Sequence, residues 1–132
     1  MPGWMSEGAA EFVAFEAMVN SGLTNRSAAQ RDLLGGAISN GAMDHRLAAF
    51  AQSRWPAWPG ELGALALAGL LDHTGTGPES ILDYTRLVGQ TGSHERAFQA
   101  VWGLSTEEFY DLVEPWRRRV GSNINAQPLW SR

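Results

Sequence analysis

The chain has 132 residues, of which 44% are hydrophobic and 18% are charged, and its formal net charge is −4 at pH 7. This length suits one domain with its own core, and the acidic balance argues against a nucleic-acid-binding surface. The sequence contains no Cys, which excludes a disulfide framework, a thiolate zinc site and a Cys nucleophile. It also lacks an apolar run long enough to span a bilayer and shows no signal peptide. We therefore expect a cytoplasmic protein with neither a nucleic-acid nor a membrane partner.

Apolar residues recur three and four positions apart along most of the chain, and no segment alternates strictly, so we predict an all-α fold. The first helix is expected over residues 6–21, with Ser6 as its N-cap and Gly22 just after its end. A second helix is expected to begin after Asn25 and to end before the pair Gly35 and Gly36. A third is expected over residues 44–53.

The next segment contains two prolines three residues apart, Pro56 and Pro59, so residues 55–60 are expected to form a rigid turn. Residues 60–73 are apolar almost all round, which is typical of a central helix buried by its neighbours. Three more helices are expected: residues 78–88 ending at Gly89, a helix capped by Ser93 and ended by Gly103, and a last helix opened by the capping box at Ser105, which Pro115 kinks or ends. The sequence thus predicts a compact bundle of six or seven short helices over residues 1–120, followed by a loose tail over residues 121–132.

Local signals for catalysis are missing. His45, His73 and His94 lie in three different segments, and no two are spaced four apart on one helix as a metal-binding pair would be. No Gly-x-Ser-x-Gly motif occurs, and the glycine-rich stretch before Pro78 follows a helix and has no nearby Lys. Three consecutive arginines, residues 117–119, suit the C-terminal end of the last helix, where cations are favoured by the helix dipole.

Two tryptophans in the proline-rich turn are candidate ligand-binding residues. Trp55 and Trp58 could line a hydrophobic groove, or they could fasten the turn onto the core. Both interpretations are open at this point.

Residues 2–12 read Pro-Gly-Trp-Met-Ser-Glu-Gly-Ala-Ala-Glu-Phe. This stretch resembles the P-x-W-x-x-E-G-x-A-E-aromatic helix of gluzincin zinc metallopeptidases, the thermolysin-like and peptidase-MA-like group. Residues 95–110, with Ala97 and Phe98 followed by Gly103 and a Glu-Glu-Phe-Tyr run, are similar to that group's C-terminal helical subdomain. The resemblance implies that Glu7 corresponds to the third zinc ligand.

The sequence departs from this group because it has no His-Glu-x-x-His helix, which would supply two zinc ligands and the general base and is expected before residue 1. A lone carboxylate does not hold catalytic zinc. The oxyanion-stabilising tyrosine of such enzymes has no close match either, and Tyr84 is the candidate that remains.

Three interpretations follow. The main one is a non-catalytic helical domain that acts by packing or by contact with a partner or ligand, including a second copy of itself. The second is a fragment of an active zinc metallopeptidase, with Glu7 as zinc ligand and the peptidase half as partner. The third is an unrelated helical protein that binds a small ligand. For the chain alone we expect no cofactor.

Overall fold

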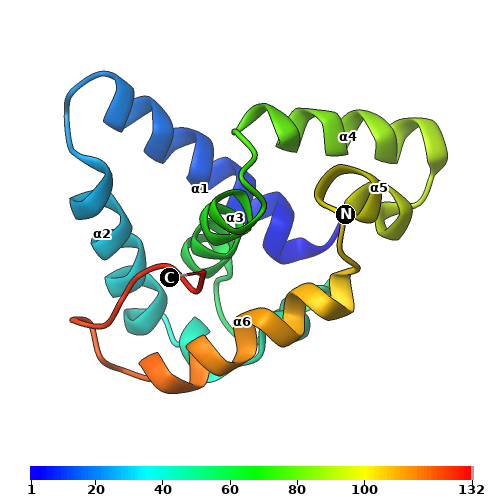
Figure 1. The fold of residues 1–132 in the computed structure, drawn as a ribbon. Coiled ribbons are helices and arrows are strands. Elements are labelled where there is room, and N and C mark those ends of the chain that lie inside the picture. Colours follow the sequence, from blue (N-terminus) through cyan, green and yellow to red (C-terminus); the bar gives the residue numbers. More distant parts are fainter. Residues whose placement is uncertain (132) are drawn as a thin grey trace.

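The computed structural model describes residues 1–131 and confirms the all-α prediction. Within that part of the chain there are six α-helices and two short 3-10 turns: α1 (Gly3–Asn20), α2 (Arg26–Ser39), η1 (Ala42–Asp44), η2 (Leu47–Phe50), α3 (Gly60–Thr74), α4 (Glu79–Thr91), α5 (His94–Trp102) and α6 (Thr106–Val120). Figure 1 shows α3 near the centre, with α1, α2 and α6 around it and with α4 and α5 together on one side. None of these helices is both long and apolar enough to cross a membrane.

The closest contact in the bundle is the crossing of α1 and α3. A Cβ atom on Gly8 would stand 2.4 Å from the carbonyl carbon of Gly63, and a Cβ on Gly63 would stand 2.1 Å from the carbonyl oxygen of Trp4. The two backbones therefore touch where neither helix carries a side chain. This approach is possible only because both positions are glycine.

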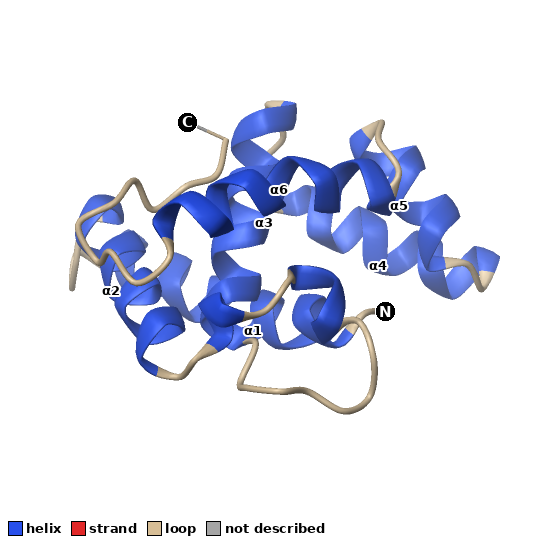
Figure 2. Ribbon diagram, turned by 90° about the horizontal axis from the view of Figure 1, so that it is seen from below, coloured by secondary structure: helices blue, strands red, loops and turns tan. Residues whose placement is uncertain are grey.

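The segment after α6 packs back onto the bundle. Leu129 and Trp130 are buried, and the Trp130 indole N–H donates to the carbonyl oxygen of Ala66 in α3 over 3.0 Å. The indole lies against Gly69, where a Cβ would stand 2.1 Å from the indole nitrogen. Figure 2 shows this segment running back along α6 toward α3. Within the tail predicted to be loose, residues 128–130 are therefore packed against the bundle, whereas residues 122–125 are exposed, and residue 132 lies outside the described residues.

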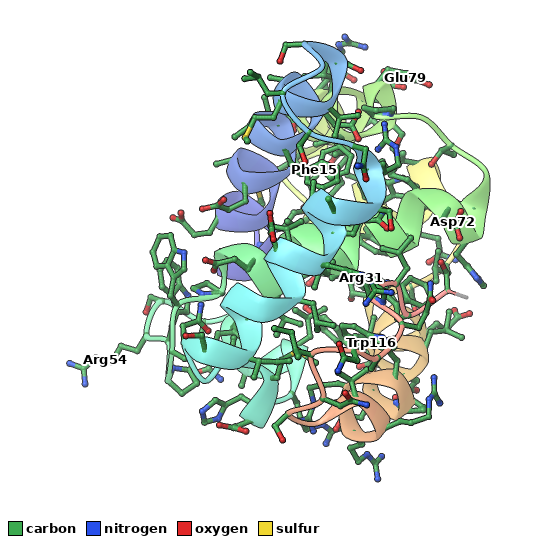
Figure 3. The ribbon with its side chains drawn as sticks, turned by 90° about the vertical axis from the view of Figure 1, so that its left-hand side faces the viewer. Phe15, Arg31, Arg54, Asp72, Glu79 and Trp116 are labelled. Carbon is green, nitrogen blue, oxygen red and sulfur yellow. The ribbon has the colours of Figure 1, made fainter. Side chains whose placement is uncertain are left out.

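Aromatic side chains fasten the outer helices to each other. In Figure 3, Phe15 lies between α1 and α2, and Trp116 lies between α6 and the C-terminal segment. The Trp116 indole N–H donates to the carbonyl oxygen of Gln127 over 2.9 Å, and the Trp4 indole N–H donates to the Tyr110 hydroxyl over 3.0 Å. Each indole thereby keeps a hydrogen-bond partner while its ring is buried.

Two predicted helix bounds are wrong in the first 40 residues of the chain. Helix α1 begins at Gly3 rather than Ser6, because the Pro2 carbonyl accepts the N–H groups of Met5 and Ser6. Helix α2 runs through Gly35 and Gly36 to Ser39 instead of ending before them. A Cβ on Gly36 would stand 3.0 Å from the Glu61 side chain of α3, so this glycine serves a close helix approach and not a helix end.

Two further bounds differ. The helix predicted over residues 44–53 is replaced by η1 and η2, because the backbone of His45 and Arg46 between them is extended. Helix α4 passes Gly89 and ends at Thr91, where Gly92 adopts the left-handed conformation with φ of 68°. The ends marked by Ser93, by Gly103 and by the Ser105 capping box are confirmed, and α6 continues past Pro115 to Val120.

One of the three arginines expected only to balance a helix dipole joins α6 to η1. The Arg117 guanidinium donates from Nε to Glu114 over 2.9 Å and from Nη1 to the Met43 carbonyl oxygen over 2.8 Å. Glu114 is buried, and its hydrogen bonds with Arg117 hold the pKa of its carboxyl below the ordinary value. Arg117 therefore has a packing role that the sequence pattern did not indicate.

We expect Gly8→Ala to lower the free energy of unfolding by about 2–4 kcal/mol, because the added methyl group meets the α3 backbone, which cannot move aside. Gly89→Ala is the matched control: this glycine lies inside α4 with nothing near its missing Cβ, so alanine should raise the free energy of unfolding by roughly 0.5–1 kcal/mol. Urea denaturation of the three proteins measures both effects. Equal stability of Gly8→Ala and the parent protein would contradict the crossing.

Candidate functional site

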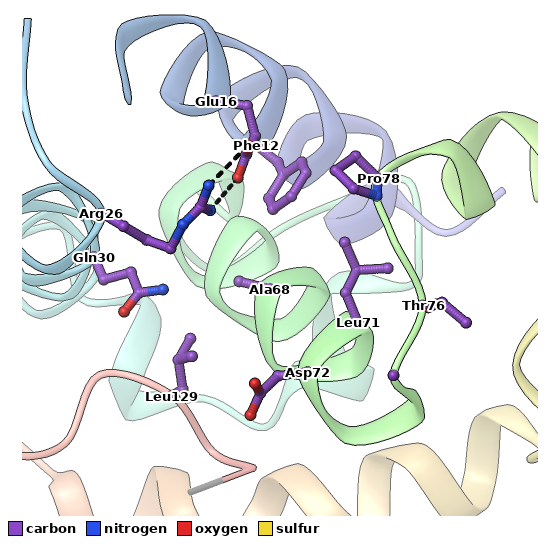
Figure 4. Close-up of a pocket in the computed structure, with 11 residues that line it drawn as sticks. Phe12, Glu16, Arg26, Gln30, Ala68, Leu71, Asp72, Thr76, Pro78 and Leu129 are labelled. Carbon is purple, nitrogen blue, oxygen red and sulfur yellow. Dashed lines mark hydrogen bonds and ion pairs between the residues drawn. The ribbon is translucent and has the colours of Figure 1, made fainter. Parts of the chain in front are cut away.

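A cleft opens where α1, α2, α3 and the C-terminal segment meet. Its volume is about 410 Å³. The apolar part of its lining comes from Phe12 on α1, Ala68 and Leu71 on α3, and Leu129 on the C-terminal segment. Figure 4 shows these side chains around the opening. The cleft is large enough for a small organic molecule and is lined by several different parts of the chain.

Gln30 on α2 is the most informative polar residue in the cleft. It is only 9% exposed, lines the cleft, and points its amide toward the centre in Figure 4. Its side chain makes no hydrogen bond to any other residue from 1 to 131. Within those residues no sealed side-chain N or O atom lacks a partner, so the Gln30 amide must face the open space of the cleft. One carbonyl oxygen and two N–H donors are thus available to a molecule there.

The charged residues of the cleft are engaged with other groups. Arg26 of α2 forms a two-pronged ion pair with Glu16 of α1, in which the guanidinium Nη2 lies 3.2 Å from Oε2. Asp72 of α3 accepts a hydrogen bond from the Ser131 hydroxyl over 2.8 Å. The Thr76 hydroxyl lies 2.9 Å from that of Thr74. These contacts tie the walls together, whereas the Gln30 amide remains open to the cleft.

Glu7, the predicted zinc ligand, lies half-buried on α1 and does not line the cleft. Catalytic zinc requires three protein ligands and an open position. Among residues 1–131, no three His, Cys, Asp or Glu side chains are grouped so that they could hold a metal ion. Among the described residues, therefore, those around Glu7 do not fit a zinc site.

Trp55 and Trp58 lie on glycines at the starts of two helices. The Trp55 indole nitrogen would stand 2.4 Å from a Cβ on Gly3, and the Trp58 indole nitrogen would stand 2.6 Å from a Cβ on Gly60. The two rings meet edge to face at 5.8 Å. This packing supports the view that the two side chains fasten the turn to the core. Trp58 remains 44% exposed, and ligand binding at this pair stays a prediction.

Tyr84 lies in the core between α4 and α5, away from the cleft. Its side chain is fully buried, and its hydroxyl lies 3.0 Å from Nδ1 of His94. Burial raises the pKa of the Tyr84 hydroxyl, and burial also lowers the pKa of His94, an effect that the nearby Glu95 carboxylate opposes. Among the four predicted site residues, only Trp55 and Trp58 lie together. Glu7 and Tyr84 each lie apart from them.

The residues that form the cleft were missed by reasoning from the sequence. Gln30 is one glutamine in a polar helix, and Leu129 lies in a segment expected to be loose. The only signal in the sequence was helical spacing. Phe12 and Glu16 are four residues apart on α1, and Ala68, Leu71 and Asp72 share one face of α3.

We expect zinc titration of this chain by calorimetry to give no tight binding, because Glu7 has no companion ligands among the described residues. Glu7→Ala and the neighbouring control Glu11→Ala should behave like the parent protein. Tight binding that Glu7→Ala abolishes and Glu11→Ala keeps would show that a metal site exists.

We expect His94 to make stability depend on pH near neutrality. Since its pKa is lower in the folded protein than the ordinary 6.5, protonation favours unfolding. Its stabilising effect is complete above pH 6.5 and is lost as the pH falls through 6.5 toward the folded pKa. The free energy of unfolding should therefore fall between pH 7.5 and pH 5.5, by at most about 1.4 kcal/mol per pH unit for one proton. His94→Gln should flatten this part of the curve; an unchanged slope would contradict the assignment.

Comparison with known proteins adds no relative. No family model, no curated protein and no solved structure matches the chain. The resemblance to gluzincin peptidases stays a prediction, and so does self-association. A function for this chain has to be argued from the geometry of its cleft.

Proposed function

We propose that this chain is a non-catalytic binding domain for a small, neutral and largely apolar ligand that presents an amide-like donor and acceptor. The observation that carries the proposal is the Gln30 amide, which is nine-tenths buried, aims into the cleft and has no hydrogen-bond partner within residues 1–131. A ligand amide could accept from its N–H group and donate to its carbonyl oxygen at the same time.

Energetics support a ligand role for this side chain. A ligand that covers the Gln30 amide without pairing it would leave a polar group unsatisfied at a cost of about 1–3 kcal/mol, so the amide favours ligands with matching hydrogen-bonding groups. The neighbours of Gln30 on α2 include buried Leu33 and Leu34, and an apolar side chain at position 30 would suit the same surroundings. An amide placed there fits a site that must recognise hydrogen-bonding groups in an otherwise apolar cleft.

The other polar groups of the cleft are already ion-paired or hydrogen-bonded within the protein, which favours binding over catalysis. Glu16 is held by Arg26, and the Thr76 hydroxyl is held between those of Thr74 and Ser80. A nucleophile activated by an adjacent base would need a free hydroxyl beside a free carboxylate or imidazole. Among the described residues lining the cleft there is no histidine.

The resemblance to the gluzincin C-terminal subdomain remains compatible with this proposal, as a domain that keeps the packing helices without the catalytic ones. Its support is the sequence of residues 2–12, now a helix whose Trp4 is fully buried. In the fragment interpretation, the peptidase half would supply the zinc ligands that this chain lacks.

The test is an NMR titration of the isotopically labelled protein with butanamide, a small primary amide. We expect the Gln30 side-chain NH₂ signals to shift with saturation at roughly millimolar concentrations, the affinity expected of so few ligand atoms. The signals are assigned by their loss in Gln30→Leu. That variant should fold with equal or greater stability, because Leu fits the apolar surroundings, and it should lose at least tenfold in affinity.

Gln90→Leu is the matched control, since Gln90 is exposed on α4 and lies outside the cleft, and its affinity should equal that of the parent protein. Pentan-2-one, which has the same shape but a methyl group in place of the NH₂ group, should bind more weakly than butanamide. Equal butanamide affinity in Gln30→Leu and the parent protein would rule the proposal out.

A further inference from the structure

A second hollow, an apolar groove, lies between α1 and the start of α4. Its volume is about 570 Å³. Its walls carry Val13 and Ala17 of α1 together with Ile81 and Leu82 of α4. Val13 is 63% exposed and Leu82 is 65% exposed, so two large aliphatic side chains face outward at its rim. Exposed apolar side chains that gather around one groove indicate something that covers them.

The groove and the cleft are neighbours that share part of their lining. Phe12, Glu16 and Pro78 line both hollows. Figure 4 shows Phe12 and Pro78 facing each other at the α1 end of the cleft, opposite Leu129 and Asp72. To reach the groove, a molecule whose polar end lies at Gln30 would have to cross this pair, which borders both hollows.

The charges along both hollows favour a neutral molecule. Glu16 and Asp72 line the cleft and Glu79 lines the groove, whereas Arg26 is the only basic residue among the described lining residues of either. Arg26 is already bound to Glu16. An anionic end group would therefore find no unpaired cation among the described lining residues of either hollow, whereas an amide would keep its hydrogen bonds with Gln30.

We infer that the natural ligand is an amphiphile with a neutral amide-type head and an unbranched aliphatic tail, the head held by Gln30 and the tail lying on Val13 and Leu82. This inference rests on the proposed function, because the position of the head is taken from it. It adds the groove as a second part of the site and narrows the ligand class from small amides to aliphatic amides.

The test compares butanamide, hexanamide and octanamide in the same NMR titration. Each methylene group that leaves water for the groove should raise the affinity about twofold to fourfold. The lower figure applies to a methylene group that the groove buries only in part. Octanamide should thus bind at least tenfold more tightly than butanamide. Octanoate, which differs by carrying a charged head, should bind at least tenfold more weakly than octanamide.

Two serine variants at exposed leucines locate the tail. Leu82→Ser places a hydroxyl in the groove and should flatten the dependence of affinity on chain length. Leu112→Ser is the matched control, because Leu112 is exposed on α6 and does not line either hollow, and it should keep the full dependence. Both positions are exposed, so both variants should fold.

The outcomes separate the two proposals. A steep chain-length series that Leu82→Ser flattens and Leu112→Ser keeps supports the inference. A series equally steep in Leu82→Ser overturns it, because the tail then lies elsewhere. Gln30-dependent binding of butanamide with no gain for longer chains leaves the proposed function standing and overturns the inference. No binding of any amide overturns both.

Discussion

The contact between the backbones of α1 and α3 at Gly8 and Gly63 sets the geometry of this domain. Both glycines lie in the N-terminal half of their helices, so the backbone contact lies in the N-terminal half of α1 and of α3. Beyond the contact, the side chains that follow at helical spacing, such as Phe12 on α1 and Leu71 on α3, need room of their own. The helices touch at this crossing, and their later turns contribute Phe12 and Leu71 to a hollow beside it.

The cleft is the space that remains there. Helix α2 supplies Gln30 on one side and the C-terminal segment supplies Leu129 on another, while Phe12 and Leu71 come from the crossing pair. The ion pair between Glu16 and Arg26 joins α1 to α2 at the edge, but so exposed a pair adds little stability by itself. The walls owe their positions mainly to buried apolar packing, so the binding groups are held by the core.

Features set by a few neighbouring residues could be predicted from the sequence. The Ser105 capping box and the glycine after α5 are examples, because a cap or a left-handed turn depends on local chemistry. Gly36 was misjudged as a helix end because a glycine that permits close packing and one that ends a helix look alike in a sequence. Gly89 was misjudged because a glycine inside a helix, with nothing near its missing Cβ, looks the same again. Gln30 could not be found at all, since its role arises only where three helices and a distant segment converge.

The C-terminal segment gives the cleft a property that a rigid pocket lacks. Leu129 forms one wall, and the neighbouring Trp130 is held to α3 by a single indole hydrogen bond to Ala66 and by packing on Gly69. The segment contributes no helix of its own, so its position depends on these contacts with the helices. Docking of the segment and occupancy of the cleft are then linked equilibria. A ligand that touches Leu129 strengthens docking of the segment by the same free energy by which docking of the segment strengthens binding of the ligand.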